Sequence, residues 1–282
     1  MKIGLSLAGG GIRGIAHVGV LKALEENNIE IEAIAGTSAG SIVATLYAMG
    51  YKPYYIYLLF KRYAKDIINI RSKPIINGVT NFIKSNKMGI TELSDGYMFE
   101  KIYDELANKK GFKLIGDIKM PLVISTVDIE EAKEYIFTNC ASRQNINDNY
   151  ITEIGIGKAV RASSSFPAVF CPCEFKNHIF MDGGVLNNIP TEELKKVYSG
   201  KIISVNFESD PIGEDYDIMN IIMKTLDIMG NKLSINSLKK SDFLLTIPTD
   251  GTGIVDVDKM DICYEYGYDF TIKNIDKIKR IM

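Results

Sequence analysis

The chain has 282 residues, and its 46% hydrophobic and 24% charged residues are ordinary for a soluble globular protein. The formal net charge of -2 lacks the basic excess that nucleic-acid binding needs, so no nucleic-acid partner is expected. A secretory signal peptide is not expected either, because the apolar run after Lys2 stops at Gly9. These features predict a cytoplasmic protein that is at most peripheral at membranes.

Strand and helix patterns alternate along the chain. Short apolar runs predict strands, and apolar residues at helical spacing predict helices. The expected strands are at 2–7, 32–35, 122–127, 134–138, 179–181, 202–207 and 243–247. The expected helices are at 15–26, 41–49, 154–162 and 218–240, with a mostly helical region at 51–110.

This alternation predicts a single-domain α/β fold, a three-layer sandwich with a mainly parallel central sheet. The domain is expected to cover 1–282, with a motif-bearing core at about 1–207 and a helical and strand extension at 208–282. The uncharged stretch at 33–51 approaches the length of a membrane span. Glycines and serines between Gly36 and Ser41 interrupt it, so a strand, a tight turn and a buried helix fit better.

The first chemical motif is Gly36-Thr37-Ser38-Ala39-Gly40, a G-x-S-x-G between a predicted strand and a predicted helix. This context is typical of the nucleophile elbow of serine hydrolases. The two glycines let the backbone turn sharply, so Ser38 is expected to occupy a strained position at the strand's end. The positive end of the following helix favours an oxyanion there. Taken alone, the motif also fits a glycine–serine turn without chemistry.

The second motif is the glycine-rich stretch 9–14, again between a strand and a helix. It matches the dinucleotide fingerprint G-x-G-x-x-G, but the second predicted strand ends without the carboxylate that would bind a ribose. Successive glycines present bare N–H groups to a small anion, here a tetrahedral oxyanion. The expected oxyanion-hole residues are Gly9, Gly10, Gly11 and Ala39. Arg13 and Gly14 are expected to support the loop, and Arg13 either braces it or adds charge.

The third motif is Asp182-Gly183-Gly184 at the end of a predicted strand, where an open α/β sheet keeps its active site. It also fits a plain turn. A nucleophilic serine usually has a histidine base, but the chain holds only His17 and His178. His17 is interpreted as a packed helix residue. His178 lies in a polar turn roughly 13 Å before Asp182, so a dyad of Ser38 and Asp182 is predicted.

In this order, the three motifs resemble the signature blocks of the patatin-like phospholipase family. The stretches 159–167 (AVRASSSFP) and 185–190 (VLNNIP) are also similar to that family. The resemblance covers about 3–207, with one departure at Ala8, where the family often has aspartate. It implies a calcium-independent lipid acylhydrolase with a Ser–Asp dyad and no catalytic histidine.

The implied substrate is a lipid or another acyl ester, cleaved through an acyl-enzyme as by a phospholipase A or a lysophospholipase. A thioesterase or carboxylesterase with the same dyad, and a non-catalytic lipid-binding scaffold, stay open as alternatives. The aromatic segment from Tyr51 to Arg62 fits either transient contact with a membrane surface or a core-packing helix. The sequence does not indicate an oligomeric state.

No metal and no cofactor are expected. The four cysteines fit no zinc spacing, and the chain is too long to need a disulfide framework. They are therefore interpreted as reduced thiols: Cys140, Cys171, Cys173 and Cys263.

Overall fold

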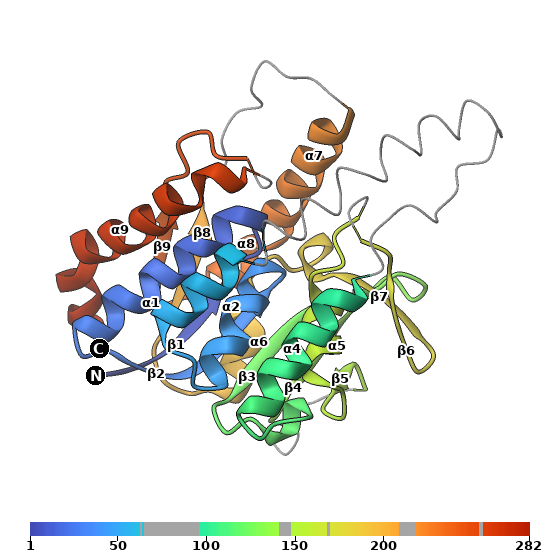
Figure 1. Cartoon of the computed structure of the whole chain (residues 1–282). Coiled ribbons are helices and arrows are strands. Elements are labelled where there is room, and N and C mark those ends of the chain that lie inside the picture. The colour runs from blue at the N-terminus through green and yellow to red at the C-terminus, as the bar shows by residue number, and fades with distance from the viewer. Residues whose placement is uncertain (63, 65–95, 141–147, 168–169, 209–217, 254–255) are drawn as a thin grey trace.

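Figure 1 shows the computed structural model, which describes all residues except 63, 65–95, 141–147, 168–169, 209–217 and 254–255. Its strands form one sheet with the main order β5-β4-β3-β2-β1-β8-β9. They are β1 (Lys2–Leu7), β2 (Glu30–Thr37), β3 (Leu122–Asp128), β4 (Lys133–Thr138), β5 (Tyr150–Ile151), β6 (Cys173–Phe175), β7 (His178–Asp182), β8 (Ile202–Phe207) and β9 (Phe243–Ile247). Strands β3, β2, β1, β8 and β9 run parallel, which confirms the predicted α/β fold with a mainly parallel sheet.

Helices cover both faces of this sheet (Figure 1). The first face carries α1 (Ala16–Glu26), α2 (Ala39–Ala48), a helix over 53–62, α4 (Tyr97–Lys109), α5 (Ile156–Ser163) and α9 (Met260–Arg280). The second face carries α6 (Thr191–Val197), while α7 (Ile218–Leu233) and α8 (Ile235–Leu238) lie between β8 and β9 in the chain. Among the described residues, no helix has the length and apolar character that crossing a bilayer requires.

Alternate residues of the buried strands pack into two separate cores. On β2, Ile34 packs into the larger core under α1 and α2, whereas Ala33 and Ala35 face the smaller core under α6. Val123 of β3 and Ile202 of β8 join the smaller core. Because side chains of a strand alternate between faces, near-continuous apolar runs are what a sheet covered on both faces needs.

Two predicted helical regions differ from the structure by more than a shift of their end residues. The predicted helix at 218–240 is divided at Ser234, whose hydroxyl donates to the Gly230 carbonyl and accepts the N–H of Asn188. Of the predicted helical region at 51–110, residues 53–62 and α4 are helical, and 65–95 lie outside the described residues.

Helix α9 was not among the expected elements, and it packs along α1. The two helices approach closely at glycines. A β-carbon at Gly267 would lie 2.0 Å from the Ala16 carbonyl oxygen, and one at Gly19 would lie 2.2 Å from that of Tyr264. With β9 paired to β8, this contact joins residues beyond 208 to the same core as the N-terminal strands.

Candidate active site

Ser38 lies in the turn between β2 and α2, where the sequence predicts a nucleophile elbow. Its φ of 52° and ψ of -123° are strained for a residue with a side chain. The turn is closed tightly around it. A β-carbon at Gly36 would lie 2.4 Å from the carbonyl oxygen of Gly40, and one at Gly40 would lie 2.3 Å from that of Leu7. Only glycine fits at these two positions, which explains the G-x-S-x-G pattern.

Asp182 lies at the same end of the sheet as Ser38, but its strand does not run in the direction that the prediction assumed. It is the last residue of β7, which runs antiparallel to β3 and pairs Asp182 with Thr126. Because the strand is antiparallel, the rule that active sites lie at the carboxyl ends of parallel strands does not by itself locate this residue. The pairing with β3, whose own carboxyl end faces the elbow side, carries Asp182 there.

The Asp182 carboxylate is buried, and its two oxygens differ. Oδ1 accepts the backbone N–H of Gly184 at 2.8 Å, while buried Oδ2 forms no well-aligned hydrogen bond with any described residue. Burial raises the pKa of Asp182 to about 6, against the effect of the Ser38 hydroxyl and of Gly184, which favour the ionised form. Oδ2 is therefore an available acceptor for the Ser38 proton, at a pKa suited to a base near neutral pH.

The glycine loop passes directly beside Ser38, but one expected donor is occupied. The N–H of Gly9 donates to the carbonyl oxygen of Asn188 at 3.0 Å, so Gly9 is not an oxyanion donor and that expectation is wrong. Its role is to leave room, because a β-carbon there would lie 3.1 Å from that of Ser38. The backbone N–H groups of Gly10, Gly11 and Ala39 have no acceptor within the described part of the chain.

Arg13 and Gly14 both act on this loop. Arg13 is buried, its Nε donates to the Gly10 carbonyl oxygen at 3.3 Å, and its guanidinium lies 5.5 Å from the centre of the Phe207 ring. A β-carbon at Gly14 would lie 2.5 Å from that of Ala39, so glycine permits contact between the loop and the elbow. Of the two interpretations of Arg13, these contacts favour bracing.

Neither histidine takes the place of a base beside Ser38. His17 is fully buried on α1, where its Nε2 lies 2.8 Å from the Ala8 carbonyl oxygen and its ring packs against Phe207. Burial lowers the pKa of His17 to about 4. The expectation that it is a packed helix residue is confirmed.

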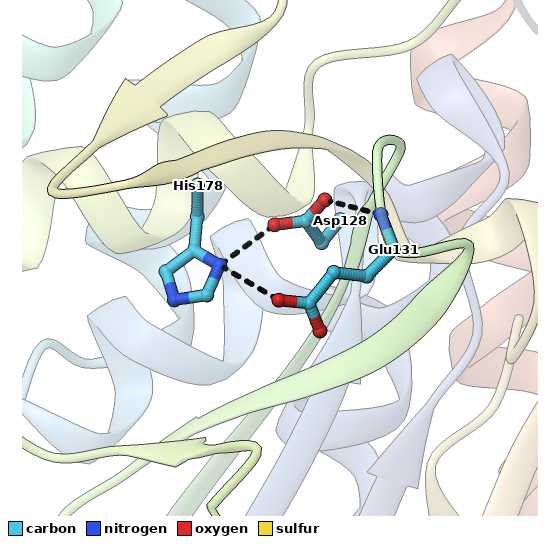
Figure 2. Close-up of side chains that lie close together, drawn as sticks. All are labelled: Asp128, Glu131 and His178. Carbon is cyan, nitrogen blue, oxygen red and sulfur yellow. Dashed lines mark hydrogen bonds and ion pairs between the residues drawn. The ribbon is translucent and has the colours of Figure 1, made fainter.

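His178 is engaged elsewhere, as Figure 2 shows. It begins β7 instead of lying in a turn before it, and its Nδ1 lies 2.7 Å from Oδ2 of Asp128 and 3.9 Å from Oε1 of Glu131. These three side chains have the donor types of a metal site. However, Asp128 Oδ1 already accepts the N–H groups of Glu130 and Glu131, so the cluster fits a set of hydrogen bonds that closes the β3–β4 turn.

Several further residues hold the site together, and sequence reasoning assigned them no role. Ser163 accepts the Ser38 N–H at 3.1 Å, and Asn187 accepts the Thr37 hydroxyl through its carbonyl oxygen at 3.0 Å. Glu134 of β4 accepts the side chain of Asn187 at 2.9 Å. Ser163 and Asn187 lie in the two stretches that resemble the patatin-like family, which was the available signal, whereas nothing in the sequence marks Glu134.

Comparison with known proteins gives a consistent result. The sequence model of the family described as patatin-like phospholipase matches residues 5–195, more than half of the chain. Lysophospholipase NTE1 of Debaryomyces hansenii is 33% identical over 74% of this chain, and that of Candida albicans is 31% identical over 73%. These matches cover only 12% and 13% of the two relatives, so the chain corresponds to a small part of their length.

The fold also has a counterpart among solved structures. The heterodimeric ExoU–SpcU complex from the type III secretion system of Pseudomonas aeruginosa matches with a TM-score of 0.52. The alignment covers 98% of this chain and 52% of the other, at 20% identity. At that identity the match concerns the fold alone.

Proposed function

We propose, from the premise that this chain belongs to the patatin-like phospholipase family, that it hydrolyses fatty-acyl esters of lipids in the manner of a phospholipase A or a lysophospholipase. The observation that carries the proposal is Ser38 at a strained turn beside the buried carboxylate of Asp182. The similarity to relatives named lysophospholipase supports a lipid ester as substrate.

In the first half of the reaction, Ser38 Oγ attacks the ester carbonyl carbon while ionised Asp182 takes its proton. The raised pKa of Asp182 makes it a stronger base than an exposed aspartate. The N–H groups of Gly10, Gly11 and Ala39 stabilise the oxyanion, an effect typically worth about 3 to 4 kcal/mol per donor. Asp182 then returns the proton to the leaving alcohol, and an acyl-enzyme remains.

The second half repeats these roles with water. Asp182 takes a proton from a water molecule whose oxygen attacks the acyl carbon, and the same N–H groups stabilise the second oxyanion. When the tetrahedral intermediate collapses, the bond to Ser38 Oγ breaks and Asp182 protonates the serine. The products are the free fatty acid and the regenerated enzyme, so the dyad needs no further proton carrier.

A fluorophosphonate probe tests this proposal, because it reacts with an activated serine. We expect a single adduct that maps to Ser38, together with release of fatty acid from lysophosphatidylcholine. Cleavage of soluble p-nitrophenyl esters without cleavage of the lipid would favour the carboxylesterase alternative. Absence of both labelling and hydrolysis would favour a non-catalytic scaffold.

We further propose that the helix over 53–62 touches the membrane surface. The sequence left two interpretations of this segment open, and each side of the helix fits one of them. Ile56 and Phe60 are buried in the main core, whereas Tyr54, Tyr55 and Leu58 are 65%, 60% and 44% exposed. Exposed tyrosines beside an aliphatic side chain suit the headgroup region of a bilayer.

Replacing the exposed side alone tests the membrane contact. The triple variant Tyr54→Ser/Tyr55→Ser/Leu58→Ser should bind anionic lipid vesicles at least about threefold more weakly, because it loses apolar area at the interface. Its hydrolysis of a soluble ester should stay unchanged. Vesicle co-sedimentation measures the first effect, and a p-nitrophenyl butyrate assay measures the second.

Leu244→Ser is the matched control for this experiment. Leu244 is 42% exposed on β9 and pairs with Ser204, whose hydroxyl bonds to Thr191 of α6. It therefore lies on the opposite face of the sheet from the helix over 53–62. Equal vesicle binding by the wild type, the triple variant and the control would contradict the membrane contact.

A further inference from the structure

Glu134 links two segments of the chain that both contact the candidate dyad. Its Oε1 accepts two hydrogen bonds, from the Ser125 hydroxyl at 2.7 Å and from the Asn187 side-chain amide at 2.9 Å. Ser125 belongs to β3 and Asn187 to the loop after Asp182, so one carboxylate oxygen joins two separate segments. Such a charged acceptor forms stronger hydrogen bonds than a neutral one.

The first arm runs through Asn187 to the nucleophile elbow. The carbonyl oxygen of Asn187 accepts the hydroxyl of Thr37, the residue before Ser38, at 3.0 Å. Its backbone N–H donates to the carbonyl oxygen of Gly183, the residue after Asp182, at 2.8 Å. Asn187 therefore contacts the neighbours of both dyad residues, and Glu134 fixes its side chain.

The second arm runs through Ser125. Its carbonyl oxygen accepts the Ser163 hydroxyl at 2.7 Å, and that hydroxyl oxygen accepts the backbone N–H of Ser38 at 3.1 Å. Ser125 also packs against the aspartate loop, because a β-carbon at Gly183 would lie 2.4 Å from its carbonyl oxygen. Both arms thus begin at Glu134 and end beside the dyad.

We propose that Glu134 is a positioning residue for the dyad, whose ionised carboxylate clamps the nucleophile elbow against the aspartate loop. This inference rests on the proposed function and adds a residue that none of the sequence motifs contains. Glu134 does not touch the substrate-side atoms of Ser38 or Asp182. It acts through Asn187 and Ser125, so its effect is on how often the dyad atoms are correctly placed.

The clamp has a built-in dependence on pH. Burial raises the pKa of Glu134 to about 7, and the nearby Glu193 carboxylate acts in the same direction. Lys196, which is bonded to Glu193, opposes the rise, and Tyr150 donates to Glu193 and accepts from Lys196. As pH falls through 7, Glu134 takes up a proton and becomes a weaker acceptor, so the clamp loosens.

The decisive variant is Glu134→Gln, which keeps the shape and an acceptor oxygen but cannot ionise. In the wild type, activity should rise with pH through two ionisations, those of Asp182 at about 6 and Glu134 at about 7. The variant should retain only the Asp182 ionisation. We expect the midpoint of its pH profile to move down by about one pH unit, and its plateau to fall about threefold to tenfold.

The measurement is the rate of Ser38 labelling by a fluorophosphonate between pH 5 and 9, with soluble-ester hydrolysis in parallel. Glu130→Gln is the control, because Glu130 is exposed in the adjacent turn. Urea unfolding establishes that each variant is folded. A wild type that is not labelled at Ser38 would contradict the proposed function and with it the clamp. Normal labelling, with the same pH midpoint in wild type and Glu134→Gln, would overturn the clamp alone, whatever the plateau.

Discussion

Ser38→Ala should reduce hydrolysis of lysophospholipid to below about 1% of the wild-type rate, a loss of at least about 2.7 kcal/mol of transition-state stabilisation. In the proposed mechanism, the variant removes the atom that forms the acyl-enzyme and leaves the proposed oxyanion donors in place. It keeps the β-carbon, so the strained φ of 52° is retained and the melting temperature should stay close to that of the wild type. Fatty-acid release and differential scanning fluorimetry measure the two effects.

Ser38→Gly is an informative companion to this variant. It should be equally inactive but more stable, because glycine adopts a positive φ without strain. At a non-glycine residue, such backbone strain typically costs about 1 to 3 kcal/mol. A Ser38→Ala protein that retains more than about 1% activity would remove Ser38 from the role of nucleophile. The serine would then be a structural part of the turn.

Asp182→Asn should be nearly as inactive as Ser38→Ala, because neither histidine is placed to act as a base. The amide keeps the shape and can still accept the N–H of Gly184, but it cannot take a proton from Ser38. In the wild type, activity should fall as pH drops through about 7 and then about 6, the pKa values of Glu134 and Asp182, and the lower step arises because protonated Asp182 is not a base. Fatty-acid release from lysophospholipid between pH 5 and 9 measures both effects.

His17→Gln and His178→Gln serve as controls for this prediction, and each should keep most of the activity. A histidine variant as inactive as Asp182→Asn would mean that the serine has a histidine base. The hydrogen bond of His178 with Asp128 lies at the opposite end of β7 from Asp182, so its loss should lower stability more than activity.

Asp182→Asn should also alter how the free energy of unfolding depends on pH. The folded-state pKa of Asp182, about 6, lies above its ordinary value of 3.8, so the folded protein binds the proton more tightly than the unfolded chain. Ionisation of Asp182 therefore costs the wild type about 3 kcal/mol of stability as pH rises from about 4 to 6. Asp182→Asn lacks this loss, and urea unfolding at pH 4.5 and 7 should show a smaller decrease. An identical decrease in both proteins would contradict a buried, raised-pKa Asp182.

Local patterns were sufficient for much of the fold. The strands at 202–207 and 243–247 begin and end as predicted, because short apolar runs between polar segments have a clear signature. The elbow at Ser38 was equally clear, since its conformation depends on glycines within two residues. Helix α9 was not predicted, and its close packing on α1 at Gly19 and Gly267, 248 positions apart, could not be read from local patterns.

The sequence by itself determined the α/β class, the identity of Ser38 and Asp182 as the candidate dyad, and the glycine loop, because each depends on residues close together in the chain. Only the tertiary structure decided which loop donors are free. Gly9 is occupied by Asn188, 179 residues away, and this could not be read from the run of glycines. Glu134 likewise meets Ser125 across neighbouring strands and Asn187 across 53 residues of chain. Sheet register and loop packing determine these contacts between distant segments, and the local sequence of either segment does not predict them.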